Sequence, residues 1–163
     1  MQSIAEIIAG MIDFYKGSFH DINHFIKVWT YAKTIGELEH LDPDTQFVLE
    51  AAAVVHDIAC PLCREKYGNA DGKHQEAESS ALLDEFLKDS GLGAAQIDRI
   101  VYLVSHHHTL DHIEGLDYRI LIEADYIVNA EESHYSAENI ANFDRKYFKT
   151  QAGHSLLHSV FRF

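Results

Sequence analysis

Apolar residues recur at intervals of three and four along most of the chain, which is the spacing of one buried face of an α-helix. The pattern starts close to the N-terminus, with Ile4, Ile7, Ile8, Met11 and Ile12. No segment of useful length alternates apolar and polar residues as a half-buried strand would. The sequence therefore predicts an all-α fold, a single helical bundle.

The helix boundaries are predicted from caps, prolines and glycine-containing loops. A helix is expected over about 21–38, and the next starts at Pro43 with Asp42 as its N-cap. That helix is expected to end near Ala59, because Pro61 follows. The polar stretch 65–73, EKYGNADGK, is predicted to be a loop. Later helices are expected over about 73–90, from near Ile97 to the SHHHT stretch, over 116–130, and once or twice within about 136–161.

Length and charge limit the classes of protein. The chain has 163 residues, 47% of them apolar, and no repeat or long linker, so one domain over 1–163 is expected. The formal charge of −13 should repel duplex nucleic acid, whereas a bound cation would still allow a small phosphorylated substrate. No charge-free apolar run of membrane-spanning length is recognised, and Glu6 and Asp13 are unlike a signal peptide. A cytoplasmic protein without a membrane partner is the expectation.

Ionisable residues occupy positions that a helical bundle would bury. The apolar segment AAAVV, residues 51–55, is followed directly by His56 and Asp57. Asp125 lies inside ILIEADYIV, and His24 borders the apolar face of the predicted helix over 21–38. All four positions are helix ends or inward faces, so the four side chains can converge in a compact bundle.

The carboxylates in this set lack a basic partner nearby in the sequence. No lysine or arginine occurs in residues 51–62, and Arg119 is six residues from Asp125. A buried carboxylate without a partner is unfavourable, so a divalent cation is the expected partner. Two imidazoles and two carboxylates suit Mn, Fe, Co, Ni or Zn. Taken singly, His24 could instead bond a backbone carbonyl, Asp57 could be a turn residue, and residues 106–108 could form a helix cap.

Cys60 and Cys63 form the short motif CPLC. Two cysteines cannot build a disulfide framework, and no strand–helix–strand pattern surrounds them as in a redox motif. They could be small residues of a turn that ends a helix, or thiols close to a metal. The sequence leaves their role open.

The pattern His24, His56-Asp57, Asp125 resembles the H…HD…D signature of the HD-domain metal-dependent phosphohydrolases. HFIKVWTYA, with Lys27 three residues after the histidine, AAAVVHDI and LIEADYIVN resemble the family's contexts for these ligands. The resemblance covers about 18–131, which would be the motif-bearing core, with closing helices over about 136–161. His20 competes with His24, because HDINH offers both histidines.

The same family includes a two-metal subgroup, and its extra histidines match His74 in KHQEAESS and His107 in VSHHHT. His106 and His108 are alternatives to His107. One or two divalent ions per chain are therefore implied. Family members often follow the HD pair with glycine and lysine, whereas this chain has IACPLCREK, in which Arg64 is the candidate basic residue.

The resemblance implies a phosphomonoesterase or phosphodiesterase acting on a small phosphorylated, nucleotide-like substrate. Asp57 would bind metal and orient the attacking water, while Lys27 and Arg64 would neutralise phosphate oxygens. Two alternatives are a non-catalytic metal- or ligand-binding module and a di-iron oxygenase on the same scaffold. The glycine-tyrosine-proline motif of the cyclic-dinucleotide branch is absent, so that substrate is not assigned. The identity of the substrate and the oligomeric state stay open.

Overall fold

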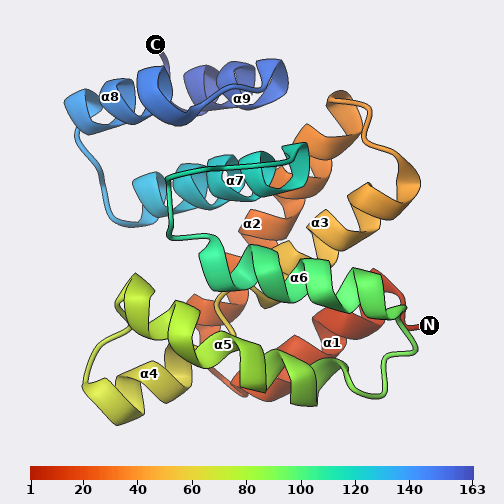
Figure 1. The fold of residues 1–163 in the computed structure, drawn as a ribbon. Coiled ribbons are helices and arrows are strands. Elements are labelled where there is room, and N and C mark those ends of the chain that lie inside the picture. Colours follow the sequence, from red (N-terminus) through yellow and green to blue (C-terminus); the bar gives the residue numbers. More distant parts are fainter.

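A computed structural model describes all 163 residues and contains nine helices and no strand (Figure 1). The prediction of an all-α fold is confirmed. In chain order the helices are α1 (Ile4–Tyr15), α2 (Phe19–Leu38), α3 (Pro43–Val55), α4 (Cys60–Tyr67), α5 (Gly72–Leu87), α6 (Ala94–His106), α7 (Leu116–Glu132), α8 (Ala137–Tyr147) and α9 (Gln151–Phe161).

The centre of the bundle is made by α2, α3 and α7, each of which contacts the other two. Helix α6 packs on α3 and α5, and α1 packs on α3 and α2. In Figure 1, α8 and α9 lie side by side at one end of the molecule, beyond α7, while α4 and α5 lie at the opposite end. Every residue from Val48 to Val55 of α3 is buried, as expected for a helix surrounded by others.

The chain breaks after α3 in a way the sequence analysis did not predict. Helix α3 ends at Val55 rather than near Ala59, and a turn over residues 56–59 follows. Pro61 lies in the first turn of α4, where its missing N–H would have no helical partner anyway. Residues 65–67 are therefore helical, and the expected loop starts only at Gly68, which has the left-handed backbone typical of a helix end.

The segment Pro43–Tyr67 is long and apolar enough to cross a membrane by length and composition alone. It contains Glu50 and Asp57, so it is not the charge-free run that the sequence analysis looked for. Within the fold, 72% of its most apolar window is buried by the other helices. A core helix of a globular protein passes the same compositional test, so this segment is weak grounds for a membrane location.

A buried carboxylate attaches the C-terminal helices to the core. Glu123 of α7 is fully buried and accepts hydrogen bonds from the backbone N–H groups of Lys149 (2.7 Å) and Thr150 (3.1 Å). Burial raises the pKa of this carboxyl, and the hydrogen bonds oppose that rise. Thr150 is the N-cap of α9 and accepts from the N–H of Gly153.

We expect Gly153→Ala to destabilise the fold by about 1–3 kcal/mol, the usual range for overpacking a core. A Cβ at this position would clash with the Glu123 carboxylate and would lie 2.5 Å from Thr150 Oγ1. Urea unfolding followed by circular dichroism measures the change. The control is Gly10→Ala, where the nearest atom is at the edge of the Phe86 ring, 3.1 Å from the added Cβ. Equal stability of the two variants would contradict the prediction.

Candidate metal centre

Four side chains predicted from the sequence converge between α2, α7 and the turn after α3. His24 Nε2 lies 3.3 Å from His56 Nε2, 3.3 Å from Asp125 Oδ1 and 3.4 Å from Asp57 Oδ2. His56 Nε2 lies 3.4 Å from Asp125 Oδ1 and 3.5 Å from Asp57 Oδ2. These five distances, measured between atoms that bind metals in proteins, fall within a narrow range.

The spacing fits a single small cation. Nitrogen and oxygen ligands about 2.0–2.1 Å from one ion in a tetrahedral arrangement lie about 3.3–3.4 Å from one another. The four groups come from distant parts of the sequence, and α2, α7 and the turn after α3 bring them together. Their chemistry, two imidazoles and two carboxylates, suits a divalent transition metal.

The histidine rings are held so that Nε2 faces the centre. His56 Nδ1–H donates to the carbonyl of Ala53 (2.8 Å), and His24 Nδ1 is 2.8 Å from Glu132 Oε2. Such partners select the tautomer whose Nε2 lone pair is free and fix the ring's orientation. The Nδ1 contacts therefore orient both rings so that Nε2 faces the other ligand atoms.

His107 is the member of the triple histidine that faces this centre. Its Nδ1–H donates to the carbonyl of Val104 (2.7 Å), and its Nε2 lies 3.7 Å from Asp57 Oδ1. That Nε2 is buried and has no hydrogen-bond partner. His106 instead stacks on Tyr102, whereas His108 lies beside His107. His56, Asp57 and His107 thus form a second ligand group that shares two members with the first.

His74 and His20 lie outside both groups. The His74 ring stacks on Tyr67 at the end of α4, and its Nδ1 is 3.0 Å from Asn69 Oδ1. His74 would have to leave these contacts to bind a metal at the centre. The side chain of His20 is 77% exposed and lies 3.9 Å from Glu132, so the structure places His24, not His20, in the cluster.

The two predicted phosphate-binding residues already face carboxylates. Lys27 Nζ is 2.6 Å from Glu132 Oε1 and 3.2 Å from Glu131 Oε2. Arg64 contacts both carboxylate oxygens of Asp21, at 2.8 and 2.9 Å. Much of their positive charge is therefore neutralised within the protein. Their role toward phosphate stays a prediction.

Two supporting residues were missed by the sequence analysis. Asn129 Nδ2 donates to Asp125 Oδ1 (2.8 Å), and Glu132 links His24 to Lys27. Asp125, Asn129 and Glu132 occupy i, i+4 and i+7 positions of α7, so they share one face of that helix. Polar residues at this spacing in an otherwise apolar helix were the sequence feature that could have identified Asn129 and Glu132.

Burial and neighbouring charges oppose one another at the centre. Burial raises the pKa of Asp57, but the nearby His56 and His107 imidazoles outweigh it and leave this pKa below its usual value. For Asp125, burial is likewise outweighed by His24 and His56, and its pKa is also lowered. Burial lowers the pKa of His24, but Asp125 and Asp57 raise it to about 9. These shifts keep both carboxylates ionised, so the cluster attracts positive charge.

The cysteines do not belong to the centre. Cys60 and Cys63 are buried free thiols in α4, and neither is a member of a ligand group. Burial raises the pKa of both thiols, which disfavours the reactive thiolate. Their position in the first turn of α4, rather than in a turn that ends a helix, corrects one of the interpretations left open above.

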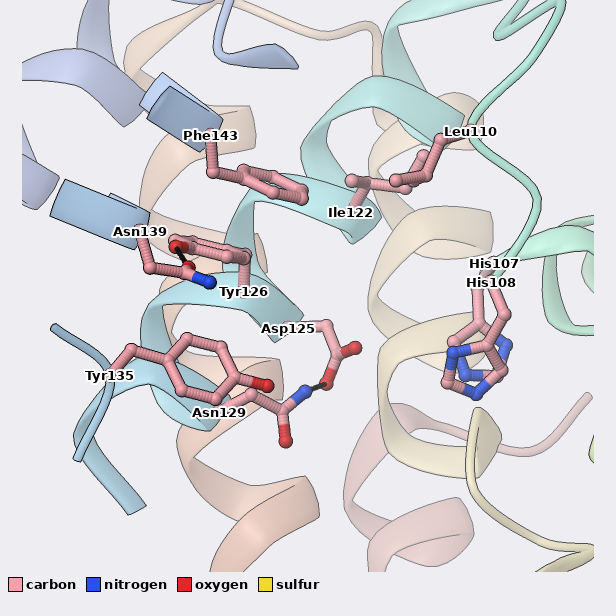
Figure 2. A pocket seen from close by; sticks show the side chains of 10 residues that line it. All are labelled: His107, His108, Leu110, Ile122, Asp125, Tyr126, Asn129, Tyr135, Asn139 and Phe143. Carbon is pink, nitrogen blue, oxygen red and sulfur yellow. Dashed lines mark hydrogen bonds between the residues drawn. The ribbon is translucent and has the colours of Figure 1, made fainter. Parts of the chain in front are cut away.

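A pocket of about 270 Å³ opens beside the centre (Figure 2). Asp125 and His107, both members of the ligand groups at the centre, also line this pocket (Figure 2). Aromatic rings of Tyr126, Tyr135 and Phe143 line it as well, and Tyr126 stacks on Phe143 with centroids 3.7 Å apart. The amides of two asparagines, at positions 129 and 139, also line the pocket.

An all-α bundle that gathers a histidine, a His-Asp pair and a distant aspartate at one buried point defines a helical protein with a candidate metal centre. The family model of the HD domain matches residues 21–140, and the chain therefore belongs to the HD-domain family. HD domains typically bind divalent metals, and the residues described above could hold one.

The fold is also similar to a solved structure, described as a predicted HD superfamily hydrolase from an uncultured Thermotogales bacterium. The similarity has a TM-score of 0.71 at 21% sequence identity and covers 97% of this chain and 84% of the other. At this identity the likeness shows the shared fold. No curated protein matches the sequence.

We expect Glu132→Gln to weaken metal binding about 10–100-fold, the usual effect of removing a carboxylate that orients a ligating histidine. Glutamine keeps the shape of the side chain but removes the negative charge beside His24 Nδ1. Glu131→Gln is the matched control, since Glu131 also pairs with Lys27 but does not contact His24. Titration with Mn²⁺ or Zn²⁺ measures both affinities. Equal affinities for the two variants would contradict the prediction.

Proposed function

We propose that the protein is a metal-dependent phosphohydrolase, a phosphomonoesterase or phosphodiesterase that acts on a small phosphorylated, nucleotide-like substrate. The observation that carries this proposal is the convergence of His24, His56, Asp57 and Asp125 in an HD-family chain. A divalent ion held by these residues would lower the pKa of a water molecule and polarise a phosphoryl oxygen. Fe, Mn, Co, Ni and Zn are the candidate ions, one or two per chain.

Asp57 is suited to a second task besides holding the metal. Its two carboxylate oxygens face different partners, Oδ2 toward His24 and His56 and Oδ1 toward His107. Its side chain is partly exposed, whereas that of His56 is fully buried. An ionised carboxylate that solvent can reach is able to accept a hydrogen bond from the attacking water and orient it.

Positive charge for the phosphate would come first from the metal. Lys27 lies in the middle of α2 and Arg64 in the second half of α4, and both side chains are about half exposed. A phosphate would have to compete with Glu132 for Lys27 and with Asp21 for Arg64. We therefore propose these two residues as secondary phosphate contacts that exchange one anionic partner for another.

The adjoining pocket supports a substrate with a ring-bearing alcohol part. Because Asp125 and His107 border both the pocket and the centre, an ester whose phosphate reaches the metal ligands can place its other half in the pocket. Tyr135 and the accessible part of the stacked Tyr126–Phe143 pair offer aromatic surface to a base. The amide atoms not bonded to Asp125 or Tyr126, Asn129 Oδ1 and Asn139 Nδ2, offer hydrogen bonds to its edge. Aromatic surface and amide groups beside a metal centre are expected of a pocket that binds a nucleotide-like substrate.

The remaining proposals concern organisation and location. We propose one domain over 1–163, a cytoplasmic location and a small-molecule substrate rather than a duplex nucleic acid or a membrane. The formal charge of −13 argues against binding of a duplex nucleic acid. The burial of Pro43–Tyr67 within the fold argues against a membrane partner.

Hydrolysis of a substrate panel tests the proposed function. Protein reconstituted with Mn, Fe, Co, Ni or Zn is offered nucleoside monophosphates, cyclic nucleotides and glycerol phosphate, and released phosphate or nucleotide is measured. We expect turnover that depends on added metal and that favours the esters carrying a base.

Failure of every metal and substrate would contradict the proposal and favour the non-catalytic binding module. Oxygen uptake by protein loaded anaerobically with iron, without ester hydrolysis, would favour the oxygenase alternative instead.

A further inference from the structure

A second cluster of ligand-type side chains joins α8 to α9, outside the centre described above. His154 and His158 are four residues apart on α9, so both rings project from the same face of that helix. Asp144, near the end of α8, lies between them. Its Oδ1 is 2.6 Å from His154 Nδ1, and its Oδ2 is 2.7 Å from His158 Nε2.

The burial of the cluster is uneven. Asp144 is only 9% exposed, and no lysine or arginine forms an ion pair with it. The side chains of His154 and His158 are 41% and 43% exposed. The carboxylate thus lies on the buried side of the cluster, and the two imidazoles lie on the side that solvent can reach.

One atom of the cluster lacks a suitable partner. Asp144 Oδ1 is buried and makes no hydrogen bond, and the nearest ring nitrogen, His154 Nδ1, lies 2.6 Å from it. A buried carboxylate oxygen left without a hydrogen bond is unfavourable. A cation between the carboxylate and the ring nitrogens would widen these contacts from 2.6 and 2.7 Å to about 3.3 Å, the distance that separates two ligands of one ion. It would then satisfy Asp144 Oδ1 together with both imidazoles.

We propose that Asp144, His154 and His158 form a second divalent-metal site, separate from the HD centre. The atoms of the three residues that can bind a metal lie within 4.8 Å of one another. Two histidines at i and i+4 of one helix are a known chelating arrangement for zinc. Two imidazoles and one carboxylate, without sulfur, suit Zn²⁺, Co²⁺, Ni²⁺ or Cu²⁺ better than Mg²⁺ or Ca²⁺, which prefer oxygen ligands. Water would complete the coordination on the exposed side.

A metal in this site would connect two helices that meet at one end of the bundle (Figure 1). Helix α8 also carries Asn139 and Phe143 of the pocket beside the HD centre. The site would therefore hold one wall of the pocket against α9. None of its three residues belongs to the H…HD…D motif, so the proposed site does not depend on the proposed phosphohydrolase function.

Metal stoichiometry in a background with an impaired HD centre tests the proposal. His56→Gln removes a shared ligand of both groups at the HD centre, and His158→Gln removes one ligand from the α8–α9 cluster. Co²⁺ alone is the probe, because its visible absorption reports coordination by nitrogen and oxygen. The matched control is His112→Asn, which removes an exposed imidazole and keeps the left-handed backbone (φ 54°) that asparagine tolerates.

We expect the His56→Gln protein to bind one equivalent of Co²⁺ and to lose it when His158→Gln is added, whereas His112→Asn has no effect. If His158→Gln does not fold, Asp144→Asn replaces it, because asparagine keeps the size of the side chain. Bound Co²⁺ should also raise Tm in the His56→Gln background and not in the double variant. Equal binding by the single and double variants, or affinity weaker than about 1 mM in the single variant, would overturn the site.

Discussion

Asp57→Asn is expected to reduce kcat by about 10²–10⁴-fold, the usual contribution of a positioned acid–base group, while the helical circular-dichroism signal is unchanged. Asparagine keeps the shape of the side chain but removes the negative charge that faces His24, His56 and His107. The variant thus loses both a metal ligand and the group that would orient water.

The measurement compares turnover at equal metal loading with the best substrate of the panel. His56→Gln should be equally inactive, because it removes a buried ligand shared by the two groups at the centre. Asp98→Asn, an exposed carboxylate on α6, is the control and should retain full activity. Turnover near the wild-type value in Asp57→Asn at equal loading would exclude a catalytic role for this aspartate.

The second large effect is expected from His107→Gln, which should remove one metal equivalent relative to the wild type. The unpartnered Nε2 of His107 faces Asp57 Oδ1, while Asp57 Oδ2 faces the first ligand group. Asp57 can therefore serve two ions at once, and paired ions in such sites lie about 3.5–4 Å apart.

Elemental analysis after reconstitution and gel filtration measures this loss. His106→Gln is the matched control from the same motif, because His106 stacks on Tyr102 and donates to its carbonyl instead of facing the centre. The control should keep the wild-type stoichiometry. An unchanged metal content in His107→Gln would leave a centre with one ion held by His24, His56, Asp57 and Asp125.

Most helices were readable from the sequence because their apolar residues recur at local helical spacing, whereas the short helix α4 (Cys60–Tyr67) was not predicted. The helix boundaries near Pro61 could not be predicted from the sequence, because a proline can either end one helix or lie in the first turn of the next. In the structure, Pro61 lies in the first turn of α4, after a turn over residues 56–59. This turn brings His56 and Asp57 toward α2 and α7. The Tyr15 hydroxyl of α1 donates to the Asp57 carbonyl (2.6 Å) and so stabilises this turn.

The candidate ligands were found because burying a carboxylate without a basic neighbour is unfavourable, and this conflict is visible along the chain. Their supporting residues were less visible. Glu132 and Asn129 are ordinary polar residues of a helix until His24 and Asp125 are known to lie beside them. The ion pairs of Lys27 with Glu132 and of Arg64 with Asp21 were also not predictable, because each joins positions far apart in the sequence.

The sequence by itself determined the helical class, the buried character of α3 and α7, and the order of the four ligand residues, because these follow from local periodicity and from the chemistry of each residue. Only the tertiary structure decided which of the three histidines at 106–108 faces Asp57, that His74 packs on Tyr67, and that Asp144 meets His154 and His158. Each of these outcomes depends on the rotation of one helix relative to another. That rotation is set by side-chain packing across the whole bundle, so no local pattern contains it.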